Sequence, residues 1–104
     1  MWSIANEPRT SQINSDTYFG EVARYTKQLD PTRPITASIA VNHKQDEAAK
    51  HLDIISFNRY NAWYQNTGRL DMVTSYVINE AKEWHEVSQS GKLWEFSLII
   101  FLLK

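Results

Sequence analysis

The sequence predicts an α/β fold in which parallel β-strands alternate with α-helices along the chain. Three observations lead to this prediction: short apolar segments of strand length recur, segments of helical length separate them, and turn residues mark the boundaries. Alternation of this kind is typical of βα units on a parallel sheet. The chain of 104 residues has the length of one domain, and its 42% apolar and 22% charged residues are typical of a globular protein.

The first expected strand covers residues 2–6, a short apolar segment that we expect to be buried. The proline that follows Glu7 biases that residue toward extended backbone. A helix is expected from Ser15-Asp16, which offer an N-cap and a favourable charge in the first turn, to Leu29. Gly20, inside it, should cost about 1 kcal/mol relative to alanine. Side chains three and four positions apart predict the buried face: Tyr18, Val22, Tyr25 and Leu29.

A second strand is expected at residues 35–41 and a third at residues 52–58, whose nearly continuous apolar run is typical of a strand buried on both faces. Residues 42–50 are polar and predict a loop with a short helix. The clearest helix is expected at residues 70–88, with a buried face of Val73, Val77, Ala81 and Trp84. The row of Glu80, Glu83 and Glu86 is expected on its solvated face.

Charge and composition argue against several classes of function. The formal net charge is −1, so the chain has no positive field to attract nucleic acid or an anionic membrane. Cysteine is absent, which removes disulfides, thiol chemistry and cysteine-ligated zinc. His43, His51 and His85 have no spacing typical of a metal site, so we expect solvated or capping roles for them and no metal or other cofactor. Neither a signal peptide nor a membrane span is expected.

Polar and aromatic side chains follow the expected strands, at the edge where parallel sheets place functional residues: Asn6-Glu7, Asn42-His43 and residues 58–64. The carboxylic acid of Glu7 at a strand end, beside an amide, suits proton donation to a leaving group, although a solvated glutamate in a turn would have the same sequence. The loop of residues 58–64 could bind a sugar through its amide, hydroxyl and aromatic groups, or pack over the core, or do both.

Three segments resemble the β-glucuronidases of glycoside hydrolase family 2, in the order and at the spacing of that family. Residues 1–8, Met-Trp-Ser-Ile-Ala-Asn-Glu-Pro, resemble its acid/base motif. Residues 29–36, Leu-Asp-Pro-Thr-Arg-Pro-Ile-Thr, resemble the segment that follows. Residues 53–60, Asp-Ile-Ile-Ser-Phe-Asn-Arg-Tyr, with Trp63-Tyr64, resemble the next strand and its aromatic loop. The residues of these motifs favour glucuronidases over their β-galactosidase and β-mannosidase relatives.

The resemblance implies a partial TIM barrel, in which three to four parallel strands alternate with helices and correspond to about the fourth to the seventh strand of a (β/α)8 barrel. It implies a retaining glycosidase that hydrolyses β-glucuronides without a metal or cofactor. Glu7 would be the general acid and then the general base, and Asn6 would contact a ring hydroxyl. Asn58, Tyr60 and Tyr64 would line the glucuronate pocket. Relatives of this kind are homo-oligomers, lysosomal or extracellular in animals and cytoplasmic in bacteria.

The end of the chain departs from the family pattern. A retaining glycosidase needs a nucleophilic carboxylate about 5–5.5 Å from the acid, and the family carries it in a pattern like Ser-Glu-Tyr/Phe-Gly. Glu95-Phe96 comes too early and lacks the serine and the glycine. We therefore expect residues 1–92 to be a fragment of the barrel domain and residues 93–104 a divergent apolar tail. The chain alone is expected to be inactive, marginally stable and prone to associate.

Other functions remain open at this point. The chain could be a complete small enzyme that uses Glu7 and Glu95, in which case Glu7→Gln and Glu95→Gln would each abolish hydrolysis of an aryl glucuronide. It could be a non-catalytic sugar-binding or interaction module built on the loop of residues 60–64, which would bind glucuronate saturably without hydrolysis. It could also be a family 2 glycosidase of another specificity, such as a β-galactosidase or a β-mannosidase.

Overall fold

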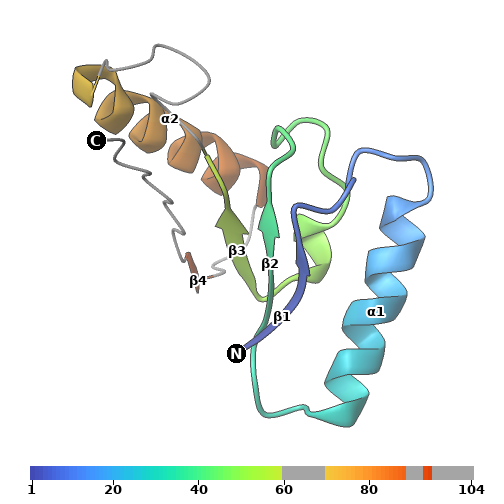
Figure 1. Cartoon of the computed structure of the whole chain (residues 1–104). Helices are drawn as coiled ribbons and strands as arrows, with labels where there is room; N and C mark the ends of the chain where they lie inside the picture. Colours follow the sequence, from blue (N-terminus) through green and yellow to red (C-terminus); the bar gives the residue numbers. More distant parts are fainter. Residues whose placement is uncertain (60–69, 89–92, 95–104) are drawn as a thin grey trace.

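The computed structural model describes residues 1–59, 70–88 and 93–94, which form one parallel sheet with two helices (Figure 1). The sheet has the strand order β1-β2-β3-β4, and every neighbouring pair is parallel. The alternating α/β fold predicted from the sequence is therefore confirmed. The elements along the chain are β1 (Trp2–Asn6), α1 (Ser15–Leu29), β2 (Ile35–Ile39), the 3₁₀ turn η1 (Ala49–His51), β3 (Ile54–Phe57), α2 (Leu70–Ser88) and β4 (Leu93–Trp94).

The observed strands agree with the predicted ones in some of their bounds and differ in others. The bounds of β1 and α2 agree with the predicted ones, whereas β2 and β3 are shorter and the expected short helix is only the three-residue turn η1. The prediction that the first strand is buried is wrong, because β1 lies at the edge of the sheet and the side chain of Trp2 is 46% exposed. Leu93 and Trp94 pair in parallel register with Ile54 and Ile55, so the start of the expected tail joins the sheet.

The buried face of α1 differs from the predicted one. Ser15, Phe19 and Ala23 are buried, whereas Tyr18 and Tyr25 are each 61% exposed and Leu29 is exposed as well. Ser15 does not cap the helix; its hydroxyl donates to the carbonyl oxygen of Arg9 at 2.9 Å. Gly20 allows the helix to approach η1, since a Cβ atom there would come within 3.0 Å of the ring of His51.

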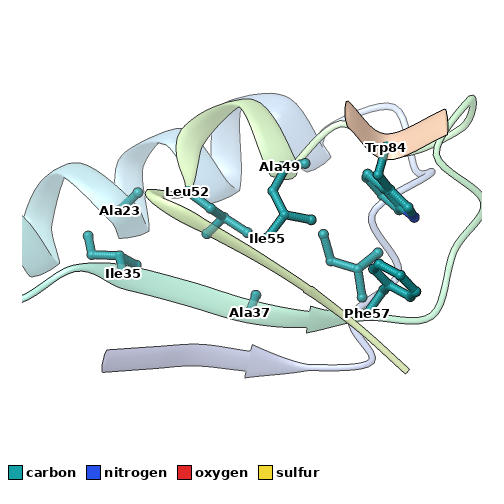
Figure 2. Packing of buried hydrophobic residues seen from close by; sticks show 9 residues of the cluster. Ala23, Ile35, Ala37, Ala49, Leu52, Ile55, Phe57 and Trp84 are labelled. Carbon is teal, nitrogen blue, oxygen red and sulfur yellow. The ribbon is translucent and has the colours of Figure 1, made fainter. Parts of the chain in front are cut away.

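A core of apolar side chains joins the sheet to the layer of α1, η1 and α2 (Figure 2). Ile55 and Leu52 lie between the strands and the helical layer, and Trp84 of α2 faces Phe57 of β3. The rings of Trp84 and Phe57 are stacked, with centroids 6.1 Å apart and planes 13° from parallel. The predicted buried face of α2 is confirmed, since Val73 and Trp84 are buried and Val77 and Ala81 are half-buried. Further core members are Ala23, Ile35, Ala37, Ile39 and Ala49.

Two aspartates fix the amino ends of the strands. Asp53 accepts the backbone N–H of Ile35 at 2.8 Å and the ammonium group of Lys27 at 2.6 Å, which joins β3, β2 and α1. Asp30 accepts the indole N–H of Trp2 at 3.1 Å and the hydroxyl and backbone N–H of Thr32. These bonds set the relative height of β1, β2 and β3, and hence where their opposite ends meet. Within the described ranges, no helix is long and apolar enough to cross a bilayer.

Candidate active site

The carboxyl ends of β1 and β3 bring Asn6, Glu7 and Asn58 together. Both ends are attached to β2, which lies between them: the N–H of Glu7 donates to the carbonyl of Ser38 at 2.8 Å, and the N–H of Asn58 donates to that of Ile39 at 2.9 Å. Since Ser38 and Ile39 are adjacent, the segments at Glu7 and Asn58 are held at the same level of the sheet. The sequence prediction that these residues share one edge is thus confirmed for Asn6, Glu7 and Asn58.

Glu7 has a left-handed backbone, with φ of 46°. The prediction of an extended Glu7 is therefore wrong. The pairing of β1 with β2 is irregular between Ser3 and Asn6, and irregularities of this kind re-aim side chains beside active sites. A left-handed residue other than glycine costs about 1–3 kcal/mol and persists only where surrounding contacts hold it. Here the bond from the N–H of Glu7 to the carbonyl of Ser38 supplies such a contact.

Asn58 is only 3% exposed. Its side-chain amide nitrogen donates to two acceptors, one on the last residue of β1 and one on the residue that follows it. One is Oδ1 of Asn6 at 3.3 Å, and the other is Oε1 of Glu7 at 3.1 Å. An amide N–H that donates to a carboxyl oxygen restricts the rotation of the carboxyl group and marks that oxygen as the one without the proton. The arrangement therefore presents an oriented carboxyl group at the exposed end of β1.

Arg59, which the sequence analysis did not single out, ties the ends of three elements. Its Nη1 donates to the carbonyl oxygens of Asn58 at 2.6 Å, Ala40 at 3.1 Å and Ile39 at 3.3 Å, and its Nη2 donates to that of Val41 at 3.3 Å. Its Nε lies 2.6 and 2.7 Å from the two carboxylate oxygens of Glu80 on α2. The guanidinium also covers the ring of Phe57, 5.3 Å from the centroid. One side chain thus joins β2, β3 and α2 beside Asn58.

Two expectations about α2 and the loop after β2 are wrong. Glu80 is not on a solvated face, since its side chain is 17% exposed and ion-paired with Arg59. His43 is buried instead of solvated: its ring lies against Trp84, with centroids 6.0 Å apart, and Nδ1 lies 3.5 Å from a carboxylate oxygen of Glu83. The described contacts of Asn42 and His43 are with Lys44 and α2. Sequence spacing alone gave no signal for the Arg59–Glu80 pair or for the contact of His43 with Glu83, because the partners lie on different elements.

Several predicted site residues lie outside the described residues: Tyr60, Trp63, Tyr64 and Glu95. A hollow of about 540 Å³ lies beside the Arg59–Glu80 pair, and its described lining is Ala40, Asn42, Arg59, Tyr76, Asn79, Glu80 and Glu83. In the part of the chain that the structure describes, no group of three or more His, Cys, Asp or Glu side chains is placed to hold a metal ion. The chemistry that the described site supports is that of one oriented carboxyl group with amide neighbours.

Comparison with known proteins extends the likeness beyond the three motifs. Residues 1–90 match the family model of the TIM barrel domain of glycosyl hydrolases family 2. The chain is 34% identical over 89 residues to the β-glucuronidase of Chlorocebus aethiops, an alignment that covers 86% of this chain and 14% of that protein. The chain therefore spans about one seventh of the length of this relative.

Solved structures show the same extent of similarity. The structure superposes on a β-glucuronidase of an uncultured Clostridium sp. with a TM-score of 0.82 and 36% identity, over 90% of this chain and 16% of that one. It superposes on a β-D-glucuronidase of Dictyoglomus thermophilum with a TM-score of 0.83 and 35% identity, over 92% of this chain and 17% of that one. The alternating strands and helices, as well as the motifs, are thus shared with these proteins.

Proposed function

Because the chain belongs to glycoside hydrolase family 2 and forms part of a β-glucuronidase-like TIM barrel domain, we propose that it is the acid/base segment of a retaining β-glucuronidase. In this proposal Glu7 protonates the glycosidic oxygen of a β-glucuronide and later takes a proton from the water that releases the sugar. The observation that carries the proposal is the oriented carboxyl group of Glu7, held by Asn58 at the carboxyl edge of a parallel sheet.

The resemblance to β-glucuronidases also gives the neighbouring residues their parts in this proposal. Asn6 contacts a hydroxyl of the sugar ring, since it is exposed beside Glu7 at the end of β1. Tyr60 and Tyr64 line the glucuronate pocket. Asn58 was predicted to line it as well, and its burial and its bond to Glu7 support a position at the base of the pocket, where it holds the acid.

Retention also requires a nucleophilic carboxylate about 5–5.5 Å from the acid. We propose that this carboxylate lies in a part of the barrel domain outside residues 1–92, and that Glu95 does not replace it. The 104 residues by themselves are then expected to release no aglycone from a β-glucuronide, and activity requires the other strands of the barrel.

The proposal can be tested by a graft into a relative that has a complete barrel. Residues 1–90 of this chain replace the matching segment of the Clostridium β-glucuronidase. The graft is expected to hydrolyse 4-nitrophenyl β-D-glucuronide, and Glu7→Gln in the graft should lower kcat/KM by about 10²–10⁴-fold. Glu7→Ala should regain turnover when azide is added and form the β-glucuronyl azide, because azide attacks the glycosyl-enzyme in place of water and needs no general base, and the enzyme carboxylate leaves.

Glu21→Gln serves as the matched control, since it removes an exposed carboxylate from α1 and should leave kcat/KM unchanged. A folded graft that hydrolyses the glucuronide equally well with Glu7→Gln would overturn the assignment of Glu7. A folded graft that prefers a β-galactoside or a β-mannoside would overturn the assignment of the substrate.

A further inference from the structure

The peptide that carries Asn58 is held by an ion pair on its outer side. The carbonyl oxygen of Asn58 accepts a bond of 2.6 Å from Nη1 of Arg59, and the guanidinium is in turn bound by both carboxylate oxygens of Glu80. The side chain of Asn58 points the other way along the site, to Asn6 and Glu7. A continuous series of polar contacts therefore runs from α2 through Arg59 and Asn58 to the carboxyl group of Glu7.

The ion pair of Arg59 with Glu80 is more buried than a typical surface salt bridge. The side chains of Arg59 and Glu80 are 15% and 17% exposed, so both have lost most of their water, and such a pair is retained only where further hydrogen bonds compensate. Arg59 makes these bonds with carbonyl oxygens at and beyond the end of β2, those of Ile39, Ala40 and Val41. The planar guanidinium has five N–H donors, which lets one side chain reach carboxylate and carbonyl acceptors together.

The carbonyl contacts of Arg59 concern the strand that also holds Glu7. The backbone N–H groups of Glu7 and Asn58 donate to the adjacent carbonyls of Ser38 and Ile39, and Ile39 is also an acceptor of Arg59. Movement of Arg59 would therefore act on Asn58 in two ways, directly through its carbonyl and indirectly through β2. The packing of Phe57 on Trp84 fixes the strand against α2 but supplies no polar contact to the Asn58 peptide.

We propose that Arg59 and Glu80 are positioning residues for the acid, a role that rests on the proposed function of Glu7. The pair fixes the backbone after β3 so that the amide of Asn58 stays within bonding distance of Oε1 of Glu7. A protonated carboxyl group then carries its proton on Oε2, because Oε1 is the acceptor of an N–H bond. The pair thus decides which oxygen delivers the proton, although it touches neither the sugar nor the reacting atoms.

The test is nuclear magnetic resonance of the 104-residue chain, which does not depend on turnover. In the wild type, the side-chain amide signals of Asn58 should shift with pH as Glu7 titrates, and Glu7→Gln should abolish the shift. Arg59→Lys keeps the positive charge but lacks the planar fork, so it should remove most of the shift. Glu80→Gln keeps one acceptor oxygen and should remove part of it. Glu86→Gln, an exposed acid of the same helix, should leave it unchanged.

The outcomes separate this role from structural support and from the proposed function. If Arg59→Lys retains dispersed signals for β2 and β3 together with the full shift, the pair is not a positioning device. If the wild type shows no shift, Asn58 does not hold Glu7. If both variants lose the dispersed signals, the pair only stabilises the fold, and the positioning role is overturned. Failure of the graft to hydrolyse a glucuronide would refute the proposed function and leave this measurement unaffected.

Discussion

The side-chain amide of Asn58 donates to Oε1 of Glu7 over 3.1 Å, although 51 positions separate the two residues in the sequence. The contact joins the ends of β1 and β3 across β2, to which both are attached by backbone hydrogen bonds. Because the donor is neutral, it can accompany Glu7 through both protonation states, which the proposed role of Glu7 as general acid and then general base requires.

Replacing this amide by a carboxyl group should change the ionisation of Glu7. In Asn58→Asp, two carboxyl groups would lie about 3 Å apart, one of them at a buried position, and like charges so close cannot both ionise easily. The pair should titrate in two steps, the second with a pKa clearly above the usual range of a glutamate. Carbon-13 resonances of the Glu7 carboxyl group, followed against pH in the wild type and the variant, measure this change.

Asn42→Asp is the matched control for this prediction. Oδ1 of Asn42 accepts the N–H of Lys44 at 2.9 Å, a bond that an aspartate can keep, and the side chain is exposed. The Glu7 titration should be the same in this variant as in the wild type. Equal titration of Glu7 in Asn58→Asp as well would show that the two side chains are not in contact in solution.

The bounds of α2 could be predicted because its apolar period is long and consistent, and Trp84 and Val73 lie on the predicted face. The face of α1 could not, because the period of Tyr18 and Tyr25 is equally regular and yet these rings remain exposed. α1 approaches η1 at Gly20, close to the ring of His51, and a contact between separate elements leaves no period in the sequence. Tertiary contacts therefore overrode a local pattern there.

The candidate site also includes residues that the sequence predicted and contacts that it did not predict. Glu7 and Asn58 were predicted because they follow apolar strands and lie within family motifs. The ion pair of Arg59 with Glu80 was not, since 21 positions separate the partners and Glu80 belongs to a row of glutamates with solvated spacing. The left-handed backbone of Glu7 was also missed, because the local effect of a following proline points to an extended residue, whereas Glu7 follows an irregular part of the pairing of β1 with β2.

Gly20 should prove necessary although it lies inside a helix. A Cβ atom at this position would come within 3.0 Å of Cε1 and 3.3 Å of Nε2 of His51, whose Nε2 is held by Asp16 at 2.6 Å. The bond with His51 is the main reason that the pKa of Asp16 lies below its usual value. We expect Gly20→Ala to lower the free energy of unfolding by about 1 kcal/mol. Displacing the ring of His51 costs more than alanine gains through its higher helix propensity, which is also about 1 kcal/mol.

The double variant separates these two effects. In a His51→Ala background, where the ring is absent, Gly20→Ala should instead stabilise the fold by about 1 kcal/mol through helix propensity. Urea unfolding of the four chains gives the coupling free energy between the two positions. Additive effects would mean that His51 does not lie over Gly20.

Asp30 should make stability depend on acid pH. Bonds from the Thr32 hydroxyl, the Thr32 backbone N–H and the Trp2 indole, followed by Arg33, hold the pKa of Asp30 well below its ordinary value of 3.8. Since the folded state lowers this pKa, the stabilisation is present above the pKa of the unfolded chain and is lost as pH falls toward the folded value. Asp30→Asn should therefore lower Tm at neutral pH, and the difference from the wild type should shrink below about pH 4.

Melting curves by circular dichroism between neutral pH and about pH 3 test this dependence. Glu86→Gln, which removes an exposed acid from α2, should shift Tm little and without the same trend. A difference between Asp30→Asn and the wild type that is constant over this pH range would mean that the bonds to Thr32 and Trp2 do not depend on the charge of Asp30.

Trp84 should be the main apolar anchor of α2 on the sheet. Its side chain is 1% exposed and lies between the rings of Phe57 and His43. Trp84→Ala should lower the free energy of unfolding by about 3–5 kcal/mol, because it leaves a cavity and removes the contacts of the indole with the rings of Phe57 and His43. Trp84→Phe keeps a ring against Phe57 and should lower the free energy of unfolding less. Ile78→Ala, on the exposed side of the same helix, should change it by at most about 0.5 kcal/mol. Equal losses for Trp84→Ala and Ile78→Ala in urea unfolding would show that α2 does not pack on β3 through the side chain of Trp84.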